Sequence, residues 1–230
     1  YCGIVHIAQT AGSVGTLNLN GGVFSAFEVA SGDPIGSSTL SLNGGTIQAT
    51  GDNATFMHDL IAAQVGAGGA IFDSAGFNIS ISQVLADNGG GGLTKNGAGT
   101  LTLTAANNYT GGRLAKAGTL AATTDSSGGG SYTVANGANL SVKVQAANAQ
   151  LTAATLTLAT STSAALSLDV GSFGNPWAAP MNVLGALAVN GAITVNITDG
   201  LPQLGQFPLI KYGSRTGSGS FVLGALPIGI

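Results

Sequence analysis

Charged residues are scarce in this sequence. They make up 7% of its 230 residues, as six lysines and arginines and nine acids, whereas soluble domains usually carry about 25%. The cations form no basic run, so the sequence offers no electrostatic footprint for nucleic acid. No stretch approaches the roughly 20 apolar residues of a membrane helix, so we expect no membrane-spanning segment.

Cysteine and histidine are nearly absent as well. Cys2 is the single cysteine, which excludes an internal disulfide framework and a cysteine-rich metal site. It leaves open an incidental thiol or an intermolecular bridge. His6 and His58 lack the spacing of metal ligands, and no glycine-rich calcium nonapeptide occurs. We therefore expect no metal and no cofactor.

The nine carboxylates are scattered singly along the chain. Enzymes that cleave polysaccharides bring two or three acids together on one face. Asp52 and Asp73 could lie one turn apart in a stacked structure, and Asp59 could orient His58 as a base. Exposed turn acids and a structurally satisfied histidine are the simpler interpretations, and no partnered serine motif exists. We expect no catalytic residues and no enzyme.

The sequence is rich in small residues and contains short repeats. Apolar residues make up 44% of the chain, and 38 residues are glycine. "TLNLNGG" begins at Thr16 and "TLSLNGG" at Thr39, while "GTLTLT" begins at Gly99 and "GTLAAT" at Gly118. Further alternating segments lie at 139–144, 154–159, 164–170 and 186–197. Alternation with a period of two predicts half-buried β-strands, separated by glycine- and asparagine-rich turns.

These repeats fit two all-β architectures. Hairpins would build a sandwich or barrel, whereas stacked coils would build a parallel β-solenoid. Similar strands recur once per repeat at the same phase, which favours the solenoid. The segment 56–65 could be a helical turn or a strand with an insertion. In the solenoid, leucines point inward and threonines outward. The expected inward residues are Leu101, Leu103, Leu120, Leu156 and Leu158, with Thr100 and Thr102 outside.

The segment 91–122, "GGLTKNGAGTLTLTAANNYTGGRLAKAGTLAA", resembles the autotransporter-associated β-strand repeat. It matches the family pattern at Leu93, Lys95, Gly97, Gly99, Leu101, Leu103, Asn108, Tyr109, Thr110, Gly111, Gly118 and Leu120. It departs from the pattern at "RLAK", where the family usually has a "TxV" strand. Residues 66–85 resemble the stretch that precedes such repeats, and residues 185–230 resemble a C-terminal closing segment.

The resemblance implies a right-handed parallel β-helix, with residues 1–230 forming a single solenoid outside the cell or on its surface. The first functional hypothesis is a structural building block of a surface fibre or stalk. Both chain ends are apolar. Either neighbouring parts of a longer chain cover them, or copies associate end to end by strand addition or stacking. The residues proposed for this contact are Ile4, Val5, Ile7, Phe221, Val222 and Leu223.

Two alternative functions remain open. The chain could be an adhesin-like binding module that recognises a glycan or another surface ligand, with Trp177 in the contact. Trp177 could instead fold over the flank of the solenoid. A polysaccharide-active β-helix enzyme is the third hypothesis.

Overall fold

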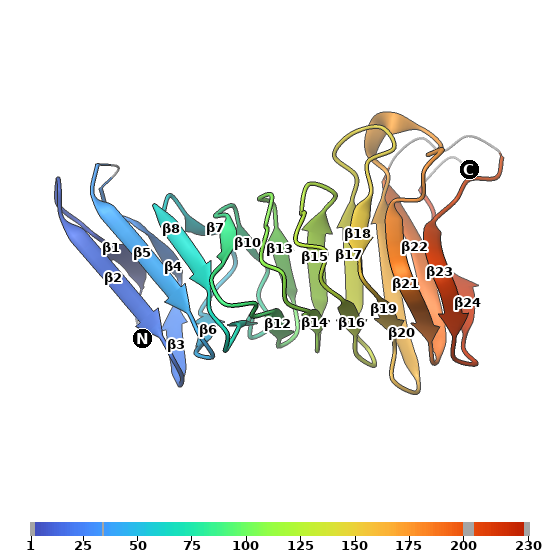
Figure 1. The fold of residues 1–230 in the computed structure, drawn as a ribbon, viewed down its shortest axis with the longest axis horizontal. Coiled ribbons are helices and arrows are strands. Elements are labelled where there is room, and N and C mark those ends of the chain that lie inside the picture. The colour runs from blue at the N-terminus through green and yellow to red at the C-terminus, as the bar shows by residue number, and fades with distance from the viewer. Residues whose placement is uncertain (1–2, 34, 200–204, 228–230) are drawn as a thin grey trace.

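The chain folds into parallel strands that stack turn upon turn (Figure 1). The computed structural model describes residues 3–33, 35–199 and 205–227; Cys2 lies outside them. All strand pairs between described residues are parallel. The protein is therefore an all-β parallel solenoid of about nine turns, as the repeats predict. Its right hand stays a prediction.

Three sheets form the sides of the solenoid. Sheet A contains β1 (Ile4–Ile7), β4 (Glu28–Ser31), β7 (Asn53–His58), β10 (Ile79–Ile81), β13 (Thr100–Leu103), β15 (Thr119–Thr123), β17 (Asn139–Lys143), β20 (Ser163–Asp169), β22 (Ala192–Asp199) and β24 (Ser220–Leu223). Sheet B contains β2 (Val14–Leu19), β5 (Ser37–Leu42), β8 (Ala62–Val65) and β11 (Leu85–Asp87). Sheet C contains β3 (Val23–Ala26), β6 (Thr46–Ala49), β9 (Ala70–Asp73), β12 (Leu93–Asn96), β14 (Arg113–Ala115), β16 (Tyr132–Val134), β18 (Leu151–Ala153), β19 (Leu156–Leu158), β21 (Met181–Val189) and β23 (Ile210–Thr216).

The sequence repeats stack in register. Leu17 pairs with Leu40 in sheet B, and Leu101 pairs with Leu120 in sheet A. The segment 56–65 belongs to β7 and β8 rather than to a helix. The expected inward leucines are buried, and the two threonines are partly exposed, which confirms the predicted alternation: Leu101, Leu103, Leu120, Leu156 and Leu158 inside, Thr100 and Thr102 outside.

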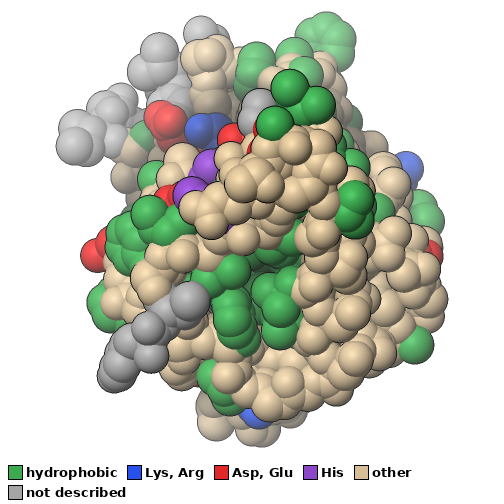
Figure 2. Space-filling model, turned by 90° about the vertical axis from the view of Figure 1, so that its left-hand side faces the viewer, with side chains coloured by type: hydrophobic (Ala, Val, Ile, Leu, Met, Phe, Trp, Pro, Cys, Tyr) green, Lys and Arg blue, Asp and Glu red, His purple; other side chains and the backbone are tan. Residues whose placement is uncertain are grey.

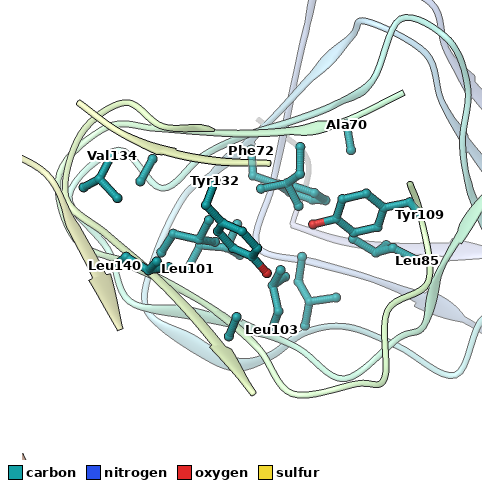
Figure 3. Close-up of a cluster of buried hydrophobic side chains, with 14 of the residues drawn as sticks. Ala70, Phe72, Leu85, Leu101, Leu103, Tyr109, Tyr132, Val134 and Leu140 are labelled. Carbon is teal, nitrogen blue, oxygen red and sulfur yellow. The ribbon is translucent and has the colours of Figure 1, made fainter. Parts of the chain in front are cut away.

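The three sheets enclose one apolar core (Figure 3). Phe72, Tyr109 and Tyr132 fill its middle section, between leucines that include Leu85 and Leu101. Fully burying one large apolar side chain contributes roughly 1.5–3 kcal/mol. Because inward positions recur once per turn, this stabilisation is distributed along the whole solenoid.

The third side of the solenoid changes from strands to loops after β11. Beyond that point the chain passes from sheet A to sheet C through segments without a sheet B strand, such as 104–112 and 124–131. The turns then lengthen. Leu101 and its partner Leu120 are 19 positions apart, whereas Leu166 and its partner Val195 are 29 apart. Sheets A and C continue regardless, so the added residues project from the side of the stack.

Strands account for nearly all of the regular structure. The described residues include one 3₁₀ helix, η1 (Gly171–Phe173). None of their helices has the length and apolar character needed to cross a membrane.

Candidate functional site

Two neighbouring loops project from the late turns, beside β18 and β21 (Figure 1). Residues 144–150 join β17 to β18, and residues 170–180, which include η1, join β20 to β21. We call them the paired loops. They occupy the side where sheet B would continue, and they add length without adding a strand to that side.

Trp177 is the most exposed large apolar residue of the paired loops. Its side chain is 90% exposed and that of Phe173 is 44% exposed, so Trp177 does not fold over the flank of the solenoid. The backbone beneath it is fixed. Asn148 Oδ1 accepts hydrogen bonds from the amides of Trp177 at 2.7 Å and Ala178 at 3.3 Å. Gln150 Nε2 also donates to the carbonyl oxygen of Ala179 at 2.8 Å.

Three cavities lined by described residues adjoin the paired loops. The first has a volume of about 230 Å³ and lies between the two loops, lined by Asn148, Phe173 and Trp177 among others. The second, of about 470 Å³, lies beside Trp177 and is lined also by Gln150 and Lys211. The third measures about 420 Å³; its lining includes Lys143, Ser172, Phe173 and Asp199. Trp177 thus borders two cavities, and Phe173 joins the first cavity to the third.

The N-terminal end exposes part of the apolar core (Figure 2). Alternation along β1 turns Val5 and Ile7 inward and Ile4 outward, where it is exposed. Leu17 and Phe24 also pack only partly against the core. The sequence-based prediction missed these two residues, although both occupy inward phases of their strands.

The C-terminal end presents a larger apolar opening. A cavity of about 360 Å³ is lined mainly by apolar side chains, including Leu209, Tyr212, Phe221 and Leu223. Phe221 and Leu223 pair with the buried residues Ile193 and Val195 of the previous turn, whereas Val222 pairs with Thr194. Four of the six residues predicted for end contacts therefore have the inward phase, namely Val5, Ile7, Phe221 and Leu223.

Asp52 and Asp73 take part in separate local contacts. Asp52 accepts a hydrogen bond from the Asn78 amide at 2.7 Å. Asp73 accepts from Gln48 Nε2 at 3.1 Å and lies beside that residue in sheet C. The structure thus gives Asp52 and Asp73 different partners instead of stacking one on the other.

His58 does have the predicted acidic partner. Its Nδ1 lies 2.8 Å from Asp59 Oδ2, and its Nε2 lies 3.4 Å from Glu28 Oε1. Both ring nitrogens therefore face carboxylates, and the contact with Glu28 links β7 to β4. Within 3–33, 35–199 and 205–227, no group of three or more histidine, cysteine or acidic side chains is placed to hold a metal ion.

Lys95 is a buried cation that sequence reasoning did not place in the core. Its Nζ donates hydrogen bonds to the carbonyl oxygens of Asn96, Gly97 and Ala117, at 3.0, 2.8 and 3.2 Å. Burial lowers the pKa of the Lys95 ammonium to about 8, and the charge of Asp73 opposes that shift. Lys95 follows Leu93 by two positions, so strand alternation alone places it inward.

Arg113 is a second buried cation. Its guanidinium lies 4.2 Å from the centroid of the Tyr109 ring and 5.3 Å from that of Tyr132, a cation–π arrangement. It also donates to the carbonyl oxygens of Tyr109 and Gly111. Burial raises the pKa of both tyrosines. The departure "RLAK" from the family pattern therefore places a charged residue in the core, where backbone acceptors and aromatic rings surround it.

Replacing Lys95 by methionine should lower the free energy of unfolding by about 1–2 kcal/mol, because three partly buried carbonyl oxygens lose their donor. Chemical denaturation measures the change. The matched control is Lys116→Met in the same repeat, at a residue whose side chain is exposed and which should leave stability nearly unchanged. Equal stability of the two variants would contradict the role assigned to Lys95.

The comparisons with known proteins agree with this geometry. Residues 93–122 match the family model of the passenger-associated-transport-repeat. The passenger-type repeat thus spans β12, β13, β14 and most of β15, including both Lys95 and Arg113.

A similarity to a curated protein extends beyond the repeat. Over 135 residues the chain is 37% identical to the adhesin BmaC autotransporter of Brucella suis biovar 1 (strain 1330). The matched region covers 56% of this chain and 4% of the adhesin, so the chain spans only a small part of that relative. The similarity implies a surface-exposed or secreted protein. No solved structure gives a significant match.

Proposed function

We propose that the chain is a surface-exposed or secreted passenger segment with an adhesive function, recognising a glycan or another surface ligand. The similarity to an adhesin over 135 residues carries this proposal. The solenoid acts as the scaffold for binding. Its stacked core holds the paired loops away from the solenoid axis, where a large ligand can approach them.

The paired loops support an adhesive function over a purely structural one. Turns of 19 residues suffice to continue sheets A and C, as the step from Leu101 to Leu120 shows. The later turns add residues that place Trp177 in solvent. Loops that do not build the core are where binding residues commonly lie on a rigid scaffold.

A surface-binding assay tests the adhesive function. Beads coated with the purified chain are applied to cultured mammalian cells and to immobilised mucin, with heat-denatured chain as the control. We expect saturable binding to at least one surface, and competition by soluble native chain. Binding no greater than that of the denatured control on both surfaces would contradict the proposal.

We further propose that the chain is not an enzyme. Asp73 and Asp87 accept hydrogen bonds from backbone amides of their own turns, as turn acids do, and Asp52 accepts one from the amide of Asn78 in the neighbouring turn of the solenoid. Purified protein should leave a panel of polysaccharides uncut, as measured by reducing-end release. Cleavage that disappears in Asp52→Asn or Asp73→Asn would overturn this proposal in favour of the enzyme hypothesis.

A second candidate function is end-to-end assembly into a fibre or stalk. Residues 185–230, which resemble a C-terminal closing segment, would form one of the two contacting ends. The apolar openings at both ends favour it. Sheets A and C reach both ends of the stack, through β1 and β3 at one end and β24 and β23 at the other. A second copy could therefore extend two parallel sheets head to tail, and such a heterologous contact propagates. In a longer protein, a neighbouring turn would cover the same surfaces.

Sedimentation velocity over a concentration series tests this assembly. We expect oligomers to grow with concentration, and we expect Leu223→Asp to restore the monomer because it places a charge in the apolar opening. Ile61→Asp, at an exposed residue directly before β8 and away from the C-terminal cavity, is the control and should reduce assembly less. A wild-type chain that stays monomeric at high concentration would exclude assembly through the ends.

A further inference from the structure

We propose that the cavities on both sides of Trp177 bind a saccharide, with a pyranose ring stacked on the indole. This inference rests on the proposed adhesive function and assigns it a site and a ligand class. One face of a pyranose presents mainly C–H groups, and its hydroxyl groups point outward from the rim. A binding site for it therefore needs a flat apolar surface bordered by neutral hydrogen-bonding groups.

Trp177 supplies the flat surface. Its side chain is 90% exposed and borders cavities of about 230 and 470 Å³. Large aromatic residues contribute strongly to binding once they are covered, and tryptophan adds an N–H donor at the ring edge. Because Trp177 borders both cavities, a sugar ring placed over the indole can direct its substituents into either one.

Hydrogen-bonding groups border the same space. The second cavity contains the side chains of Gln150 and Lys211, and Asn148 and Asn175 line the first. Among the described residues, none that lines the first cavity is charged, and Lys211 is the only charged one that lines the second. Amides together with one ammonium match hydroxyl, carbonyl or carboxylate oxygens of a glycan better than they match a long apolar segment.

The site is held in place before any ligand arrives. Asn148 Oδ1 accepts from two successive amides of the second loop, those of Trp177 and Ala178. At the base of the loops, the Leu151 amide donates to the carbonyl oxygen of Pro180 at 2.8 Å. A fixed backbone reduces the entropic cost of ordering the loop on binding. The loop that carries the exposed Trp177 is therefore preorganised for contact with a ligand.

The arrangement of the cavities indicates an oligosaccharide rather than a single sugar. Phe173 and Val144 border both the first cavity and the third, of about 420 Å³, which also contains Ser172 and Gln145. The three cavities thus adjoin one another along the paired loops. A chain of several sugar units could occupy them, with Trp177 and Phe173 as its two aromatic contacts.

A glycan array followed by titration calorimetry tests the saccharide site. The array contains neutral hexose oligomers and uronate-containing oligomers, so that it separates a neutral ligand from an acidic one. We expect the wild type to bind at least one of these classes and Trp177→Ala to lose at least tenfold in affinity. Trp177→Phe should keep part of the affinity, because it preserves an aromatic face. Phe27→Ala, an exposed aromatic residue far from the paired loops, should bind like the wild type.

Each outcome separates the saccharide site from the wider adhesive function. Trp177 makes little contact with the core, so its variants should unfold at the wild-type temperature. Glycan binding that is unchanged in Trp177→Ala would overturn the site. Binding of the wild type to cells or mucin, without binding to any oligosaccharide class on the array, would also overturn it but would leave the adhesive proposal standing with a protein ligand. Absence of binding to cells, mucin and array would contradict both.

Discussion

Replacing Leu103 by alanine should lower the free energy of unfolding by about 2–5 kcal/mol, the usual cost of truncating a buried leucine. The Leu103 side chain is 2% exposed. It pairs with Ile81 in one neighbouring turn and with Ala122 in the other. A cavity at this position therefore removes contacts from three successive turns, and the surrounding sheets cannot close around it without breaking their register.

The neighbouring residue provides the control for this prediction. Thr102 pairs with Ser80 and Ala121 on the outward face of the same strands. Thr102→Ala should change stability by no more than about 0.5 kcal/mol, as for most surface substitutions. Denaturant titrations of both variants measure the difference. Similar losses in the two would contradict the inward and outward assignment.

A second large effect is expected at the glycine-rich corner. A Cβ atom added at Gly91 would overlap the carbonyl oxygen of Gly66 and lie 2.9 Å from the amide nitrogen of Gly69. These obstacles are backbone atoms and cannot rotate away. Gly91→Ala should therefore destabilise the protein by about 2–3 kcal/mol, at the upper end of overpacking costs, in thermal or denaturant unfolding.

Gly112 provides the matched comparison at the same corner. A Cβ atom there would meet only the carbonyl oxygen of Ser131, at 3.6 Å, which is an ordinary contact. Gly112→Ala should thus be tolerated or slightly stabilising, because alanine restricts the unfolded chain more than glycine does. A greater loss of stability in Gly112→Ala than in Gly91→Ala would contradict the close approach of turns at this corner.

The stacking of the turns could be predicted because it follows from short repeats of alternating apolar and polar residues. The repeats beginning at Thr16 and Thr39 contain the same alternation at the same phase, and the structure pairs those two residues directly. The two "GTL" segments likewise place Thr100 beside Thr119. This register is stable because it buries leucine at every second position. The strand pairing is therefore the one that the local alternation predicts.

Other features depend on contacts between distant parts of the chain, which the alternation of apolar and polar residues does not reveal. Lys95 has an inward phase, but a lysine pattern alone does not reveal that three carbonyl oxygens converge on its Nζ. The change from sheet B to loops after Leu85–Asp87 leaves no periodic signal, because loop residues gain little from core burial. For the same reason the sequence identified Trp177 as a candidate contact but left its exposure open.

Backbone NOE contacts between β13 and β15 test the stacked-turn architecture most directly. In the parallel solenoid, each residue from Thr100 to Leu103 contacts the residue 19 positions later, from Thr119 to Ala122. Parallel pairing keeps this difference constant along the strands, whereas an antiparallel hairpin keeps the sum of the two positions constant. We expect contacts of Leu101 with Leu120 and of Leu103 with Ala122. Contacts of Leu101 with Ala122 and of Leu103 with Leu120 would contradict the parallel solenoid.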